Sequence, residues 1–152
     1  NSAILSGFLI PPPLYYFIAI AITIGTRFFL EINISSHSAL WTAGILLLAG
    51  SIALALWTKY VMTRKGTTAN SYKQSMVVVT NGPFRFSRNP MYLSINLLTI
   101  GLSFVFNDLI LLILTGFAVL IIHVVIKREE RYLAKKFGEE YLRYKKRVRR
   151  WI

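Results

Sequence analysis

The stretch TNGPFRFSRNPMY, residues 80–92, separates a long polar connection from the second half of an apolar chain. Asn81-Gly82 is a turn signal, and Pro83 and Pro90 restrict the backbone on either side of two arginines. Pro90 suits the first turn of a helix because its missing N–H would have no partner there, and Asn89 is a suitable N-cap. The stretch therefore predicts a loop that ends in a helix start at Pro90.

The composition places the chain in the membrane class. Of its 152 residues, 55% are hydrophobic and 16% are charged, and the mean hydropathy is +0.53. These values are too apolar for an ordinary soluble domain. The net charge of +12 would suit nucleic acid, but the basic residues cluster beside apolar segments and fit anionic headgroups better. We therefore expect membrane lipids as partners and no nucleic acid. The absence of cysteine excludes disulfides, cysteine-ligated zinc and a cysteine nucleophile.

Four apolar runs predict an all-α integral membrane protein with a single domain, residues 1–152. A span needs roughly 20 apolar residues, and the predicted spans lie at about residues 14–30, 39–62, 90–106 and 109–126. No small-residue cleavage site follows the first run, so we expect it to stay in the membrane. Small residues of the second run, such as Gly44 and Gly50, predict close helix packing.

The remaining segments are a connection at residues 64–89 and a tail at residues 127–152. The run Val77-Val78-Val79 in the connection is too short to span and too apolar for a free loop, so it predicts an extended segment packed onto the protein or a ligand. The tail carries aromatic residues at helical spacing among Lys and Arg, which predicts an amphipathic helix on the membrane surface, with Tyr141 and Tyr144 as interfacial anchors. Most basic residues lie in these two segments, so the positive-inside rule predicts that both are cytoplasmic.

The pair Glu129-Glu130 stands at the cytoplasmic end of the fourth predicted span. A carboxylate at a helix C-terminus opposes the helix dipole, at a cost of about 0.3–1 kcal/mol unless a cation compensates. Lys127, Arg128 and Arg131 can supply that compensation, so a structural and a functional role are equally open for the pair.

Other polar residues favour structural roles. His123 and His37 lie far apart along the chain, which predicts no metal site and favours a helix–helix hydrogen bond for His123. The sequence contains no glycine-rich phosphate loop and no Ser-His-Asp set.

Four motifs follow one another in the second half of the chain: VVTNGPF at residues 78–84, RNPMY at 88–92, EE at 129–130 and FGEEYLRY at 137–144. In order and spacing they resemble the isoprenylcysteine carboxyl methyltransferases and their bacterial relatives. That family has Leu-Val-x-x-Gly-x-Tyr, Arg-His-Pro-x-Tyr, a Glu-Glu pair and Phe-Gly-x-x-Tyr-x-x-Tyr. The resemblance implies an integral-membrane enzyme that uses S-adenosylmethionine.

The resemblance also implies where the cofactor binds, namely on the cytoplasmic side between the long connection, the last two spans and the tail. The implied cofactor-binding residues, with Glu129 on the cofactor's ammonium group, are Met76, Val77, Val78, Val79, Phe84, Asn89, Pro90, Met91, Tyr92, Glu129 and Glu130. Val125 stands where the family has its substrate-binding Arg, so Arg88, Lys127 or Arg128 would hold a substrate anion instead. We take Arg88 and Arg128 as the candidate catalytic residues.

The implied activity is methyl transfer from S-adenosylmethionine to a membrane-associated amphiphile, such as the carboxylate of an isoprenylcysteine-like lipid. The sulfonium methyl is already activated, so the protein mainly positions the reactants and excludes water. A carboxylate acceptor needs no general base. The alternatives are a phospholipid or small-molecule methyltransferase, a sterol-reductase-like membrane enzyme that uses NADPH, and a non-enzymatic scaffold that binds lipid through its basic tail.

Overall fold

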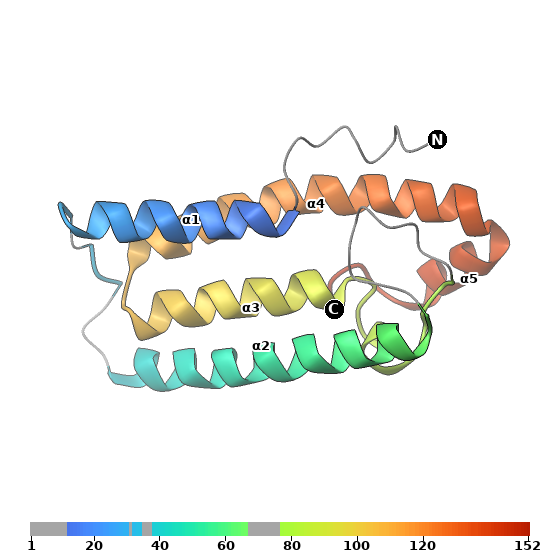
Figure 1. The fold of residues 1–152 in the computed structure, drawn as a ribbon, viewed down its shortest axis with the longest axis horizontal. Helices are drawn as coiled ribbons and strands as arrows, with labels where there is room; N and C mark the ends of the chain where they lie inside the picture. The colour runs from blue at the N-terminus through green and yellow to red at the C-terminus, as the bar shows by residue number, and fades with distance from the viewer. Residues whose placement is uncertain (1–11, 31, 35–37, 67–76) are drawn as a thin grey trace.

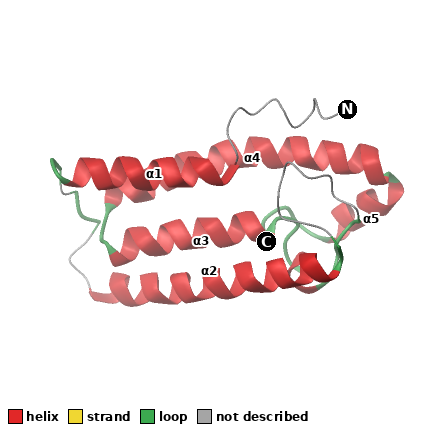
Figure 2. Cartoon of the chain, viewed as in Figure 1, coloured by secondary structure: helices red, strands yellow, loops and turns green. Residues whose placement is uncertain are grey.

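The structure is a computed structural model that describes residues 12–30, 32–34, 38–66 and 77–152. Within these residues the fold is all-α, as predicted, with helices joined by loops (Figure 2). The five α-helices and one 3₁₀ helix of the described residues are α1 (Pro12–Arg27), α2 (Ser38–Arg64), η2 (Gly82–Arg85), α3 (Pro90–Val105), α4 (Leu109–Phe137) and α5 (Glu139–Arg147).

Two helices, α2 and α4, are long and apolar enough to cross a membrane. Only 11% of the apolar window of α2 and 33% of that of α4 are buried inside the protein, whereas a core helix of a soluble protein would be mostly buried. Apolar side chains left exposed over such a length fit contact with lipid. α3 is apolar but shorter. The structure thus contains two candidate spans in its described part, and four spans remain a prediction.

α2 packs along α3, and α4 lies against both α1 and α3 (Figure 1). The predicted close packing of the second run is confirmed at Gly44. A Cβ atom on Gly44 would lie 2.8 Å from the Gly101 carbonyl oxygen of α3, and one on Gly101 would lie 3.0 Å from the Gly44 carbonyl oxygen. The two backbones therefore approach as closely as only glycine allows. A Cβ atom on Gly50 would have no neighbour within 4 Å, so Gly50 does not contribute to this packing.

A tight turn joins α3 to α4 at the predicted position. Asn107 has a left-handed backbone with φ of 51°, and the Asp108 carboxylate accepts a hydrogen bond from the Leu111 N–H at 2.9 Å. Asp108 therefore caps α4. The Asn107 side chain also accepts from the N–H of Ile34, which ties the turn to the segment before α2.

The fourth helix does not end near Ile126, so the predicted boundary is wrong. α4 continues without a break to Phe137, because the charged residues after Ile126 are good helix formers and contain no Gly or Pro. Gly138, with φ of 52°, ends α4, and α5 folds back toward α2 and α3 (Figure 1). Tyr141 and Tyr144 of α5 are 3% and 4% exposed. They pack into the protein, and the prediction that they anchor the tail at the membrane surface is wrong.

Candidate functional site

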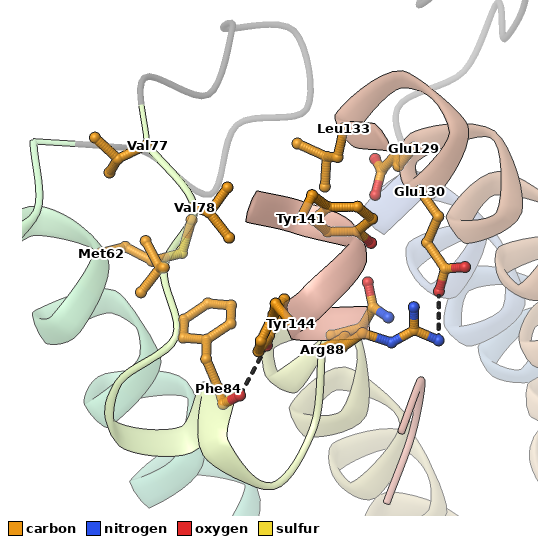
Figure 3. A pocket seen from close by; sticks show the side chains of 12 residues that line it. Met62, Val77, Val78, Phe84, Arg88, Glu129, Glu130, Leu133, Tyr141 and Tyr144 are labelled. Atoms are coloured by element: carbon orange, nitrogen blue, oxygen red, sulfur yellow. Dashed lines mark hydrogen bonds and ion pairs between the residues drawn. The ribbon is translucent and has the colours of Figure 1, made fainter. Parts of the chain in front are cut away.

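A pocket of about 90 Å³ lies at the end of the molecule where α5 and the loop before α3 meet α2 and α4 (Figure 3). The side chains that line it come from segments far apart in sequence: Met62, Val77, Val78, Val79, Phe84, Arg88, Asn89, Glu129, Glu130, Leu133, Tyr141 and Tyr144. The structure therefore brings together most of the residues that the motifs singled out.

The other predicted site residues stand apart from the pocket lining. Pro90, Met91 and Tyr92 begin α3 directly behind it, and the Tyr92 hydroxyl donates to Glu129 Oε1 at 3.0 Å. Arg128 is exposed and is not among the lining residues. Met76 lies outside the described residues.

One wall of the pocket is apolar, with Met62, Val77 and Val78 on it, and Leu133 lies across from them beside Glu129 (Figure 3). Residues 77–80 carry no helix or strand, in line with the predicted packed segment. Phe84 completes this wall from η2, a turn that starts at Gly82 with φ of 59°. A side chain at Gly82 would be strained by that φ, and its Cβ would also lie 2.8 Å from Val61.

The hydroxyl of Tyr144 fixes η2 from α5 by donating to the Phe84 carbonyl oxygen at 2.7 Å (Figure 3). Burial raises the pKa of Tyr144, so the hydroxyl stays protonated and able to donate at physiological pH. This bond joins α5 to the loop across the pocket.

Asn89 does not cap α3, contrary to the prediction. Its backbone has φ of −132° and ψ of 54°, and its side chain makes no cap hydrogen bond to the helix. The side-chain amide instead donates to the Arg150 carbonyl oxygen at 3.0 Å. The C-terminal segment presents a second carbonyl beside it, since the N–H of Arg88 donates to the Arg149 oxygen at 3.0 Å. The loop before α3 is therefore held by the end of the chain, which the sequence did not indicate.

Glu130 lies at the centre of a charged cluster and is 3% exposed. Arg150 donates from Nε to Oε1 at 2.8 Å and from Nη2 to Oε2 at 2.9 Å, Arg88 Nη2 lies 3.1 Å from Oε1, and Lys145 Nζ lies 3.7 Å from Oε2. The hydrogen bond to Glu130 raises the pKa of Arg150. The cations that compensate Glu130 thus come from the loop and the end of the chain.

The sequence left open whether basic neighbours on the same helix balance the charge of the Glu129-Glu130 pair, and for Glu130 the structure gives other partners. Among the described residues, the ion pairs of Glu130 join it to Arg88, Lys145 and Arg150, and none of these three lies on α4. Arg128 and Arg131 lie two positions and one position from Glu130 and so point to other faces of the helix, and Lys127, three positions away, is exposed.

His123 contacts the C-terminal segment, where the sequence predicted a neighbouring helix. Arg150 Nη1 lies 3.2 Å from His123 Nε2, and Trp151 Nε1 lies 3.4 Å from His123 Nδ1, with the two rings stacked. A neutral imidazole accepts at one nitrogen only, so the shorter contact to Arg150 assigns Nε2 as the acceptor. Nothing in the sequence distinguished Arg150 from the other basic residues of the tail, whereas the spacing of Tyr141 and Tyr144 was visible in the motif.

The lining residues fit S-adenosylmethionine by their chemistry. Glu129 offers a carboxylate for an ammonium group, the valine and phenylalanine wall suits a purine ring, and Arg88 offers a guanidinium for a carboxylate. The volume of about 90 Å³ is below the roughly 300–1,000 Å³ of typical small-molecule pockets. The pocket in this state therefore accommodates part of such a ligand, and the whole ligand requires it to widen.

Residues 39–140 match the family described as phospholipid methyltransferase, a stretch that runs from α2 to the start of α5 and contains both candidate spans. The chain is also 44% identical over 63 residues to an "Uncharacterized protein" of Haemophilus influenzae, and that match covers 41% of this chain and the whole of the relative. No solved structure matches the chain. Methyltransferases of the matched family use S-adenosylmethionine. The chain therefore belongs to the phospholipid methyltransferase family of membrane enzymes, which transfer a methyl group from S-adenosylmethionine to a lipid-like acceptor.

Proposed function

We propose that the pocket between α4, α5 and residues 77–89 is where this chain binds S-adenosylmethionine and the polar end of its acceptor. The observation that carries the proposal is Glu129. Its carboxylate lines the pocket and is oriented by the hydrogen bond from the Tyr92 hydroxyl at 3.0 Å. An oriented, partly buried carboxylate is the group that holds an ammonium ion best.

The remaining lining residues have distinct tasks in this proposal. Val77, Val78 and Phe84 provide the apolar surface against which the adenine ring packs, and the Tyr144 bond to the Phe84 carbonyl keeps that surface in place. When bound, the cofactor supplies a methyl group on a positively charged sulfur, which is already a good electrophile. The protein therefore has to hold the nucleophile in line with that methyl and keep water out.

The proton-accepting groups of the pocket are already engaged. Glu130 is paired with Arg88, Lys145 and Arg150, and Glu129 accepts from Tyr92. Burial acts to raise the pKa of Glu130, but the hydrogen bond from Arg150 and the charges of Arg88, Arg150 and Lys145 lower it below its usual value, so Glu130 is a weak base. This observation favours an acceptor whose nucleophile needs no deprotonation.

Two acceptor classes follow. The family membership supports a phospholipid-type acceptor, and the absence of a free base among the described lining residues favours a carboxylate such as that of an isoprenylcysteine-like lipid. Arg128, exposed on α4 near the pocket residues Glu129 and Glu130, is placed to meet an anionic headgroup at the membrane surface.

We also propose a cytoplasmic pocket in a single domain of four spans. The basic residues of the loop and of α5 gather at the pocket end of the helices, while the turn at Asn107 and Asp108 lies at the opposite end (Figure 1). The positive-inside rule favours the cytoplasm for the basic end. Cysteines introduced at Lys146 and Asn107, labelled from each side of oriented vesicles, test this orientation.

Label transfer tests the activity and separates the acceptors. The purified chain in lipid nanodiscs is given S-adenosylmethionine with a labelled methyl group, together with either an amine-headgroup phospholipid or farnesylcysteine. Label in the phospholipid supports the first class, and label in a base-labile ester of farnesylcysteine supports the second. Absence of label from both, with a folded chain that binds the cofactor, contradicts both acceptor assignments.

Glu129→Gln tests the site itself. We expect the affinity for S-adenosylhomocysteine, measured by calorimetry in detergent, to fall about 10- to 100-fold, because the amide keeps the shape of the side chain but loses the charge that holds the ammonium. Glu140→Gln is the matched control, since Glu140 is exposed on α5 and lines no part of the pocket. Equal affinity in the wild-type chain and in Glu129→Gln would remove the basis of the proposal.

A further inference from the structure

The charged cluster below the pocket contains more positive than negative groups. Arg88, Lys145 and Arg150 surround the single carboxylate of Glu130. Both oxygens of Glu130 are used by the two-point contact from Arg150. His123, the other partner of Arg150, is a ring that accepts a hydrogen bond and brings no negative charge. The cluster is therefore short of anionic oxygen atoms.

Arg88 is the residue of the cluster whose donors lack acceptors. Its side chain is 8% exposed, and its contact with Glu130 uses Nη2 alone, at 3.1 Å. Nε and Nη1 of Arg88 are both buried and have no hydrogen-bond partner among the described residues. Buried donors of a charged group are nearly always satisfied in folded proteins, because water is no longer there to replace the missing acceptor. Two nitrogens of one guanidinium without a hydrogen-bond partner call for an acceptor that the described residues do not provide.

The Tyr141 hydroxyl interacts with the Arg88 side chain and is the acceptor to consider first among the described residues. Burial and the Glu130 charge raise the pKa of Tyr141 to about 12, although the Arg88 guanidinium acts in the opposite direction. Its hydroxyl is therefore protonated and neutral at physiological pH, and it cannot supply the missing negative charge.

The position of Arg88 indicates what can reach it. Its side chain lines the pocket between Tyr144 and Glu130, and it is covered from bulk solvent (Figure 3). The pocket therefore gives a partner access to the Arg88 side chain. Among ligand groups, a carboxylate or phosphate oxygen matches a guanidinium best.

We propose that Arg88 forms an oxyanion-binding subsite of the pocket, in which Nε or Nη1 donates to a carboxylate or phosphate oxygen of a bound reactant. The inference rests on the proposed function, and the oxygen has two possible sources there: the α-carboxylate of the cofactor, or the acidic group of the lipid acceptor. In both cases Arg150 acts as a positioning residue. Because Arg150 donates to both Glu130 oxygens, Nε and Nη1 of Arg88 do not pair with Glu130.

A purely structural role for Arg88 leads to a different expectation. Pairing with Glu130 needs only one cationic nitrogen, and a lysine can supply it. Arg88→Lys therefore retains the ion pair with Glu130 and removes the additional donors, so it separates the two roles. Arg85→Lys is the matched control, because Arg85 is exposed on the same loop and lines no part of the pocket.

The binding experiment uses the full chain in detergent and two ligands that differ in the carboxylate. S-adenosylhomocysteine has the α-carboxylate, and 5′-methylthioadenosine lacks the amino-acid end. If the oxygen comes from the cofactor, Arg88→Lys lowers the affinity for S-adenosylhomocysteine about 10- to 100-fold and leaves the affinity for methylthioadenosine unchanged. If it comes from the acceptor, neither nucleoside is affected, and lysophosphatidic acid in mixed micelles binds about 10- to 100-fold more weakly to Arg88→Lys than to wild type.

A second measurement avoids dependence on the variant. The Nε–H resonance of Arg88 in the ¹⁵N-labelled wild-type chain, assigned through bonds from its backbone amide, reports directly on a new acceptor. If the oxygen comes from the cofactor, this resonance shifts when S-adenosylhomocysteine is added. If it comes from the acceptor, the resonance shifts when lysophosphatidic acid is added in the presence of saturating methylthioadenosine. Unchanged affinities and a resonance insensitive to both ligands overturn the inference. Failure of the wild-type chain to bind S-adenosylhomocysteine at all would contradict the proposed function instead.

Discussion

Arg150 and Glu130, twenty positions apart, are joined at two points, from Nε to Oε1 at 2.8 Å and from Nη2 to Oε2 at 2.9 Å. The same Arg150 accepts a hydrogen bond from the Asn89 amide through its backbone carbonyl. One residue near the end of the chain therefore connects α4, the loop before α3 and the pocket. The arrangement makes the pocket dependent on the C-terminal segment, which the family match at residues 39–140 does not include.

Arg150→Gln should destabilise the fold and weaken ligand binding. The substitution removes two charge-assisted hydrogen bonds from a buried carboxylate, but Arg88 and Lys145 remain as partners, so we expect a loss of about 1.5–3 kcal/mol in the free energy of unfolding. Arg88 should then turn toward the Glu130 oxygens and lose its spare donors. Chemical unfolding in detergent measures the first effect. Arg149→Gln, exposed on the same segment, is the control, and equal stability of both variants would contradict the structural role of Arg150.

Tyr92→Phe should weaken cofactor binding more than it weakens the fold. The hydroxyl of Tyr92 orients Glu129 through a hydrogen bond of 3.0 Å, and its loss frees the carboxylate to adopt other rotamers. We expect the affinity for S-adenosylhomocysteine to fall about 3- to 10-fold, which corresponds to roughly 0.7–1.4 kcal/mol for one hydrogen bond. Calorimetry checks this, with Tyr132→Phe on α4 as the control outside the pocket lining. An affinity unchanged by Tyr92→Phe would show that Glu129 needs no such orientation.

Gly44→Ala should be clearly destabilising, although alanine favours helices. The new methyl group would lie 2.8 Å from the Gly101 carbonyl oxygen and 2.8 Å from a Val105 methyl carbon, so α2 and α3 would have to separate, at a cost of about 1–3 kcal/mol. Gly50→Ala on the same helix meets nothing within 4 Å and should be neutral or stabilising by up to about 1 kcal/mol. Thermal unfolding in one detergent compares the two, and a result in the opposite order would contradict the close approach.

Asn89→Asp should loosen the C-terminal segment. The substitution replaces the amide donor to the Arg150 carbonyl by a second acceptor, so two oxygens face each other at about the present 3.0 Å. We expect faster amide hydrogen exchange of residues 148–152 and a loss of about 1–3 kcal/mol in the free energy of unfolding. Asn81→Asp provides the comparison, since Asn81 is exposed and makes no side-chain cap hydrogen bond to η2. Identical exchange in both variants would speak against the contact.

Local features of the sequence predicted much of the fold. The apolar runs indicated the membrane class, Pro90 marked the start of α3, and the break between the predicted spans 90–106 and 109–126 marked the turn before α4. Each of these depends on properties of a few neighbouring residues, such as the missing N–H of proline or the capping carboxylate of Asp108. The helix end predicted at Ile126 failed because hydropathy changes there while helix propensity does not.

The candidate site was predicted to a lesser depth. The motifs singled out Val77, Val78, Val79, Phe84, Arg88, Asn89, Glu129 and Glu130, which the structure places around one pocket, and their roles in binding remain predictions. The partners of these residues were not foreseen. Glu130 has many basic residues within reach along the sequence, and only the fold determines that Arg88, Lys145 and Arg150 contact it.

The amino-acid sequence alone is enough to predict the membrane as the solvent of this protein, the approximate positions of its helices and the motif residues of the site. These properties follow from composition and from interactions between near neighbours in the chain. Tertiary packing is needed to bring the last residues of the chain back to the loop before α3, and to leave Arg88 with buried donors beside the pocket. Hydrogen bonds and ion pairs between distant segments form only when the two groups are positioned to within a few tenths of an ångström, and that positioning exists only once the helices have packed.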